Sequence, residues 1–458
     1  MRRQALIVYF ERRGAELLRN FIAQLDRRPI QVKLLLAALM LFCVPGFFLS
    51  LNKADKLDHS WYSAAIWVKG ADCARTTKAI LAICQEGRLL PIADVSAGDD
   101  PGPPLVLDLY AALTDAVVTE TDISRVNTIL NYVGIVSLAG LFLCLRLPFL
   151  SFLVLTVGAV IANKLHSLGP HPGHLGVACL VALLPLAILG VPSTGPSRAN
   201  WWLWMIAGLL GLAVGMVFRE AIGLMGVVTA LLALGVSYFC SLMKMRHAGL
   251  AHLLIVGATV LTIWTPYSIL RARDAVFDIA PSTRMEQHGA WHNLYIGLGV
   301  VENPFGIVWS DSDGARAVQE VSPTTLYLST EYYSILKRRY FEIVLHHPIE
   351  VATIYLKKAM TALATYKMTR LIIVLSVVFA WARLSLARYS AGWSSYDAVF
   401  SVSAVFVVTF LGQAALFHYA ETYLFPVKIF LLLLSGVVVE LLLALTRMSK
   451  FAPVSRQD

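Results

Sequence analysis

The chain has 458 residues, of which 57% are hydrophobic and only 15% are charged, and its formal net charge is +9. A mean hydropathy of +0.68 excludes an ordinary soluble domain of this length and predicts an all-α membrane protein with several spans. The basic residues gather in short segments beside apolar runs, as the positive-inside rule distributes them, so the charge does not favour a nucleic-acid partner.

The N-terminal segment, residues 1–32, alternates arginines with apolar residues. This pattern predicts a basic amphipathic helix on the anionic cytoplasmic leaflet. The first apolar run, residues 33–51, continues through Val44–Phe48 without a small-residue cleavage site, so we expect an uncleaved span and not a signal peptide. That span delivers residues 52–123 to the outer side of the membrane.

This first outer loop is too long to be a simple connection. Apolar positions recur at helical spacing in residues 57–69 and 104–118, which predicts two helices along the membrane surface, joined by the glycine- and proline-rich segment 97–104. Cys73 and Cys84 share the loop, and the sequence is compatible both with a disulfide between them and with two free thiols.

With the first span, the sequence predicts about ten spans and places both termini inside. The further spans are roughly residues 124–145, 148–163, 174–192, 200–218, 221–242, 248–270, 371–387, 396–417 and 424–445. Residues 350–366 are interrupted by Lys357 and Lys358 and are predicted to be a surface helix. The chain thus divides into a cytoplasmic segment (1–32), an N-terminal transmembrane module (33–270), a second outer loop with surface helices (271–370) and C-terminal spans with a short tail (371–458).

Carboxylates follow the first span directly. Asp58 and Tyr62 are four residues apart, so a helix would place them on one face. This position, directly after a membrane span, makes Asp58 the first candidate for chemistry. The alternatives are that Asp58 caps a helix or pairs with Lys56, and Asp55 is a competing carboxylate that suits an N-cap.

Four motifs, in this order along the chain, resemble those of the GT-C membrane glycosyltransferases, which include the protein O-mannosyltransferases and the lipid A aminoarabinose transferase. Asp58–Tyr62 resembles an Asp-Glu-x-x-Tyr pattern, Pro101–Leu105 a "PPL" segment, Leu261–Tyr267 with Arg271 a "TPW…RN" span end, and Glu421–Val427 an "ERYLLPV" segment. The chain departs from the family at His59, where glutamate is usual, and at Thr422, where arginine is usual.

The resemblance implies a GT-C-like bundle with juxtamembrane helices in its outer loops. It also implies inverting transfer of a monosaccharide from a polyprenyl-phosphate donor to a glycolipid, polysaccharide or protein, on the periplasmic face of a bacterial-type inner membrane. Asp58 would be the general base, and Tyr62, Glu421 and Tyr423 would contact substrate. Two alternatives stay open, a lipid-linked oligosaccharide ligase or polymerase, and a secondary transporter or flippase. Broken helices and mid-membrane charges, which would favour the transporter, are not evident in the sequence.

Cationic side chains at outer span ends suit a phosphate leaving group. Arg219 and Glu220 interrupt an apolar stretch, and the resemblance makes Arg219 a donor-phosphate ligand; a boundary pair between the two residues is the alternative. Arg271 and Arg273 at the next outer span end would complete a cationic pocket, although interfacial arginines that only reach the headgroups give the same pattern.

The second outer loop supplies the remaining candidates. His288, His292 and Tyr295 are expected to line the acceptor side. The two histidines lack a third ligand at convincing spacing, so no metal is assigned and a divalent cation is not indicated. Lys357 and Lys358 are interpreted either as contacts to anionic headgroups or as cations that steer the lipid-phosphate donor.

Overall fold

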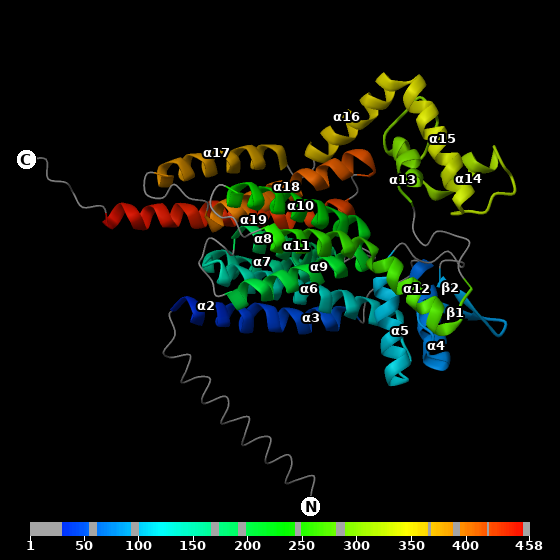
Figure 1. Cartoon of the computed structure of the whole chain (residues 1–458), viewed down its shortest axis with the longest axis horizontal. Coiled ribbons are helices and arrows are strands. Elements are labelled where there is room, and N and C mark those ends of the chain that lie inside the picture. The colour runs from blue at the N-terminus through cyan, green and yellow to red at the C-terminus, as the bar shows by residue number, and fades with distance from the viewer. Residues whose placement is uncertain are drawn as a thin grey trace, which may run out of the picture.

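The computed structural model describes residues 30–54, 62–92, 100–165, 174–190, 198–242, 249–280, 289–364, 368–387, 394–418 and 421–451. Its largest part is a bundle of long helices, with smaller helices and two strands at one end (Figure 1). The bundle comprises α2 (Ile30–Ala38), η1 (Leu39–Cys43), α3 (Val44–Ala54), α6 (Glu120–Cys144), α7 (Pro148–Leu165), α8 (His174–Gly190), α9 (Arg198–Phe218), α10 (Glu220–Leu242), α11 (Gly249–Leu261), η4 (Thr262–Trp264), α12 (Thr265–Phe277), α17 (Met368–Ala387), α18 (Ser395–Leu416) and α19 (Glu421–Phe451).

Seven helices within the described residues are long and apolar enough to cross a membrane, and α7 and α8 contain shorter apolar stretches. Helices suit this environment because each one satisfies its own backbone hydrogen bonds where no water is available. The prediction of an all-α membrane protein is therefore confirmed. The predicted ranges lie within a few residues of the helices, except that the run predicted to end at residue 270 continues as α12 to Phe277.

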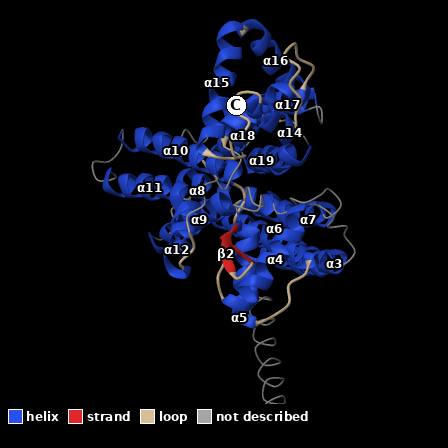
Figure 2. Cartoon of the chain, turned by 90° about the vertical axis from the view of Figure 1, so that its right-hand side faces the viewer, coloured by secondary structure: helices blue, strands red, loops and turns tan. Residues whose placement is uncertain are grey.

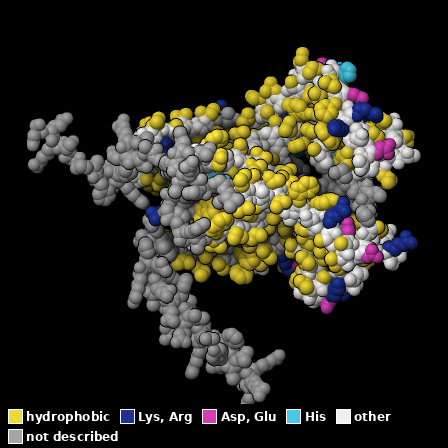
Figure 3. All heavy atoms as spheres, in the orientation of Figure 1, with side chains coloured by type: hydrophobic (Ala, Val, Ile, Leu, Met, Phe, Trp, Pro, Cys, Tyr) yellow, Lys and Arg dark blue, Asp and Glu magenta, His cyan; other side chains and the backbone are white. Residues whose placement is uncertain are grey.

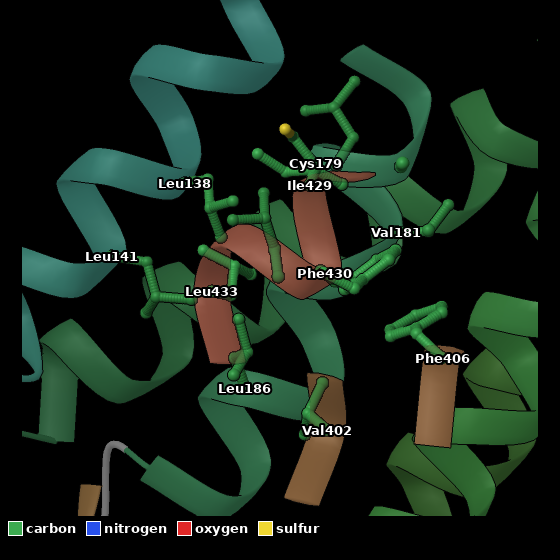
Figure 4. Packing of buried hydrophobic residues seen from close by; sticks show 14 of the residues in the cluster. Leu138, Leu141, Cys179, Val181, Leu186, Val402, Phe406, Ile429, Phe430 and Leu433 are labelled. Atoms are coloured by element: carbon green, nitrogen blue, oxygen red, sulfur yellow. The ribbon is translucent and has the colours of Figure 1, made fainter. Parts of the chain in front are cut away.

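Helix α8 lies at the centre of the bundle. It is apolar on all sides and contacts α6, α9, α10, α18 and α19. In Figure 4, Cys179 of α8 lies beside Ile429 of α19, and Val181 of α8 and Phe406 of α18 lie near Phe430 of α19. The Phe406 and Phe430 rings stack with centroids 4.2 Å apart. Side chains from segments more than 200 residues apart in sequence therefore form one core.

The backbones of α6 and α8 touch. A Cβ atom added to Gly134 would lie 2.4 Å from the carbonyl oxygen of Gly176. The Gly176 N–H also donates to Asn131 Oδ1 at 2.9 Å. Small residues at such crossings allow close helix packing inside a membrane, so larger side chains at Gly134 or Gly176 would separate the two helices.

One end of the bundle carries both groups of described residues that lie outside it, and we call it the loop-bearing end. The start of α2 and the end of α19 lie at the opposite end (Figure 1). The first lobe consists of residues 62–92 and 100–119, with α4 (Tyr62–Thr77), β1 (Ala82–Gln85), β2 (Arg88–Pro91) and α5 (Gly102–Thr114). The second lobe consists of residues 289–364, with α13 (Ala290–Gly297), η5 (Leu298–Val300), α14 (Asp311–Gln319), α15 (Thr330–His346) and α16 (Pro348–Ala364).

The first lobe differs in detail from the prediction. Its first described helix begins at Tyr62 and continues to Thr77, well beyond the expected end at residue 69. A β-hairpin that was not predicted follows, with Glu86 and Gly87 both at positive φ in its two-residue turn. Pro103 and Pro104, expected in a turn, instead form the first turn of α5, because proline has no N–H to lose there and its φ suits a helix.

A disulfide joins Cys73 of α4 to Cys84 of β1. The disulfide and the packing of α4 on α5 hold the elements of the first lobe together.

The second lobe has its own core of aromatic and aliphatic side chains, among them Leu298, Tyr332, Leu336 and Ile354. Its last two helices, α15 and α16, form a hairpin that projects from one flank of the bundle (Figures 1 and 2). Helix α16 coincides with the predicted surface helix to within two residues at either end.

Candidate functional site

Several predicted site residues lie outside what the structure describes. Asp58, Asp55 and His288 belong to segments outside the described residues. Tyr62 begins α4 and Glu421 begins α19, but their side chains and that of Tyr423 are not described. The candidate site is therefore built from the side chains around the loop-bearing end, where charged side chains gather on both lobes (Figure 3).

Arg219 lies at the corner between α9 and α10 and pairs with an acid of the first lobe. Its Nη1 donates to Asp100 Oδ2 at 2.7 Å, and the two side chains are only 11% and 8% exposed. This contact gives Arg219 a partner that the sequence did not indicate. A guanidinium and a carboxylate this buried stabilise each other strongly, because either one alone would be a desolvated charge.

The backbone brings these two charges together. Gly102, the first residue of α5, packs so closely on Phe218 that an added Cβ would lie 2.6 Å from the Phe218 ring. Phe218 ends α9 and immediately precedes Arg219, while Asp100 lies two residues before Gly102. The start of α5 therefore sits on the corner that presents Arg219.

Arg273 is not part of an open cationic pocket. It is 3% exposed, donates from Nη1 to the Leu81 carbonyl at 2.9 Å, and donates to Asp274 from Nε and Nη2. It thus attaches α12 to the first lobe. Arg271, two residues earlier, is exposed and lies 4.9 Å above the Tyr267 ring, so it remains available to a ligand.

His292 and Tyr295, predicted to line the acceptor side, are buried in the second lobe. His292 is fully buried, and its Nε2 donates to Asp311 Oδ1 at 3.1 Å while its Nδ1 accepts from the Tyr332 hydroxyl at 2.7 Å. Both ring nitrogens of His292 are therefore engaged within the lobe. Tyr295 is 6% exposed, and burial raises its pKa.

The two adjacent lysines of α16 have different environments. Lys357 is exposed, as a headgroup or donor contact would require. Lys358 is fully buried, and its ammonium donates to the carbonyls of Gly297 at 3.0 Å and Leu416 at 2.9 Å. Burial lowers the pKa of Lys358 to about 7. Lys358 therefore joins α16 to α13 and to the end of α18.

Asp108 is a functional candidate that the sequence did not single out. It is fully buried between α4, α5 and β1, and its Oδ2 accepts the Leu81 N–H at 2.6 Å. Among the residues that the structure describes, its Oδ1 has no hydrogen-bond partner. Burial raises the pKa of Asp108 to about 7, although the Leu81 hydrogen bond opposes this shift.

Because Asp108 is buried, the stability of the protein is expected to depend on pH. Folded Asp108 keeps its proton up to a pH near 7, whereas the unfolded chain releases it near 3.8, so its contribution is complete at low pH and is lost as pH rises towards 7. The loss is roughly 4 kcal/mol. We expect Asp108→Asn to flatten the decline in thermal midpoint between about pH 4 and about pH 7, as followed by tryptophan fluorescence in detergent.

Asp72→Asn is the matched control, because Asp72 is an exposed acid of the same lobe, paired with Arg75. Surface pairs contribute little, so this variant should keep the wild-type pH profile. An Asp108→Asn profile as steep as that of the wild type would contradict the assignment.

The fold and the side chains at the loop-bearing end define a multi-pass helical membrane protein with two lobes at one end of its bundle. Comparison of the chain with protein-family models, curated proteins and solved structures returns no match.

Proposed function

We propose that the protein transfers a monosaccharide from a polyprenyl-phosphate donor to a glycolipid, polysaccharide or protein acceptor at the outer face of a bacterial inner membrane. The four motifs that resemble the GT-C glycosyltransferases are the starting point. In this proposal the chain has ten spans with both termini in the cytoplasm, so both lobes lie in the periplasm.

The observation that supports the proposal best is the position of Arg219. It sits at the loop-bearing end, on the α9–α10 corner, against the first lobe and beside the Pro101–Pro104 segment. A lipid-phosphate donor entering from the bilayer would meet the protein at this level. Arg219 is buried against Asp100, and its planar guanidinium is of a kind that suits a phosphate oxygen; the exposed Arg271 adds a second cation.

The chemistry follows from these groups. Asp58 would accept the proton of the acceptor hydroxyl as that oxygen attacks the anomeric carbon. The bond from that carbon to the donor phosphate oxygen would break with inversion, and the polyprenyl phosphate would leave with the electron pair. Cations near the phosphate would stabilise the developing charge, so no acid is needed for the leaving group.

Release of polyprenyl phosphate tests the proposal directly. The purified protein, reconstituted in vesicles, is incubated with a panel of polyprenyl-phosphate monosaccharides and with membrane extract as acceptor, in the presence and absence of divalent cations. We expect release from at least one donor together with labelled acceptor. If the protein is shown to be folded by its thermal unfolding and still releases polyprenyl phosphate from no donor, that result would contradict glycosyl transfer and favour the transporter alternative.

A further inference from the structure

The hairpin of α15 and α16 exposes a row of large apolar side chains. Leu345 is 74% exposed near the end of α15, and Ile349, Leu356 and Met360 of α16 are 78%, 63% and 59% exposed. The three α16 positions are spaced by seven and four residues, so they lie on one face of the helix. Continuous apolar faces of this kind mark a surface that is covered by a partner or by lipid.

The opposite face of α16 is firmly held. Val351 and Ile354 are buried in the core of the second lobe, and Lys358 binds the carbonyls of Gly297 and Leu416. Helix α16 also packs against α18. The exposed row therefore cannot turn inward without breaking these contacts, and it is a fixed feature of the surface.

The Lys358 contacts also fix the position of α16 along the direction in which the bundle crosses the membrane. Its partner Leu416 is the last residue of α18, one of the helices able to cross a membrane. Met360 consequently lies near the end of that span. Ile349 precedes Lys358 by nine residues, or about 14 Å along the helix axis, and Figure 1 shows α16 inclined to the bundle. The whole row thus lies close to the level of a membrane surface.

The apolar row continues into a surface that faces outward from the bundle. Helix α17 follows α16, packs on the candidate span α19, and exposes Val374, Val377 and Trp381. The hairpin and α17 lie on the same flank of the bundle in Figures 1 and 2. Lipid against α17 would therefore extend without interruption to Met360 and Leu356.

We propose that the α15–α16 hairpin is seated in the leaflet at the loop-bearing end, with Met360 and Leu356 among the acyl chains and Ile349 and Leu345 at the headgroup boundary. Polar side chains of the hairpin fit this boundary, with Arg338 beside Glu342 on α15 and His347 beside Glu350 at the tip. The lipid bilayer is the partner, and the inference does not depend on the proposed transferase activity.

Site-specific fluorescence in lipid tests the placement. Single cysteines at positions 345, 349, 356 and 360 are labelled with an environment-sensitive dye in the full chain, with Cys144 and Cys240 replaced by serine. The protein is reconstituted in vesicles of phosphatidylethanolamine and phosphatidylglycerol that contain nitroxide lipids of different depth. We expect blue-shifted emission at all four positions, with deep nitroxides quenching position 360 most and shallow nitroxides quenching position 349 most.

Leu326 provides the matched control, since it is a large apolar residue of the second lobe, 54% exposed and outside the hairpin. A dye there should emit as in water and escape quenching. Emission typical of water at positions 356 and 360 would overturn the inference. So would a blue shift that needs high protein density and is not quenched by nitroxide lipids, because it would indicate contact with a second copy.

Discussion

Asp58→Asn is expected to lower the rate of glycosyl transfer by roughly 10²–10⁴-fold, the range that general-base catalysis contributes. Asparagine has nearly the same shape as aspartate but cannot accept the proton of the acceptor hydroxyl. The measurement is release of polyprenyl phosphate from the donor identified in the panel, by variant and wild-type protein at equal amounts. The thermal midpoint should stay unchanged, because the substitution alters charge more than volume.

Asp55→Asn is the control that separates the two neighbouring acids. Asp55 suits a helix cap, whose loss typically costs about 1 kcal/mol. This variant should lose a little stability and keep most of its turnover. If Asp55→Asn abolished transfer while Asp58→Asn retained it, the general base would be Asp55 and the resemblance to the Asp-x-x-x-Tyr spacing would have misled the assignment.

Removing Arg219 is the second change with a large expected effect. Arg219→Met leaves Asp100 buried without its cation, and breaking such a pair costs about 3–5 kcal/mol. Asp100→Leu should cost a comparable amount for the same reason. Thermal unfolding of the two variants in detergent measures this loss, and both are expected to unfold well below the wild type.

The double variant separates structure from function. Arg219→Met with Asp100→Leu replaces both charges by apolar groups, a change that is often nearly neutral for stability at buried pairs. Stability should therefore return close to the wild-type value. If Arg219 also binds the donor phosphate, transfer should stay low and the KM for the donor should stay raised. Full recovery of transfer would show that Arg219 serves only to join α5 to the bundle.

Much of the fold could be predicted because membrane spans depend mainly on length and composition. An apolar run of about 20 residues has few alternatives to a helix. The short hairpin of β1 and β2 was missed, since four-residue strands carry little periodicity, although Glu86-Gly87 is compatible with a tight turn. The helices α13, α14 and α15 were not resolved individually because their polar faces hide the apolar pattern.

The candidate site was harder to predict because burial decides what a polar side chain does. Arg273, His292 and Lys358 have the chemistry of ligands, yet each is buried and holds elements of the protein together. The partner of Arg219 lies 119 residues earlier, and no local pattern connects the two. Asp108 gave no signal at all, since an acid within an apolar helical pattern is also found on solvated helices.

The Lys358 contact implies an order of assembly during synthesis. Of its two carbonyl partners, Gly297 is made before Lys358, whereas Leu416 is made 58 residues after it, at the end of α18. The ammonium can therefore not complete its hydrogen bonds until the chain has been made to the end of α18. Until then the second lobe is an independent body on a growing chain, and insertion of the late helices is the step that fixes its position.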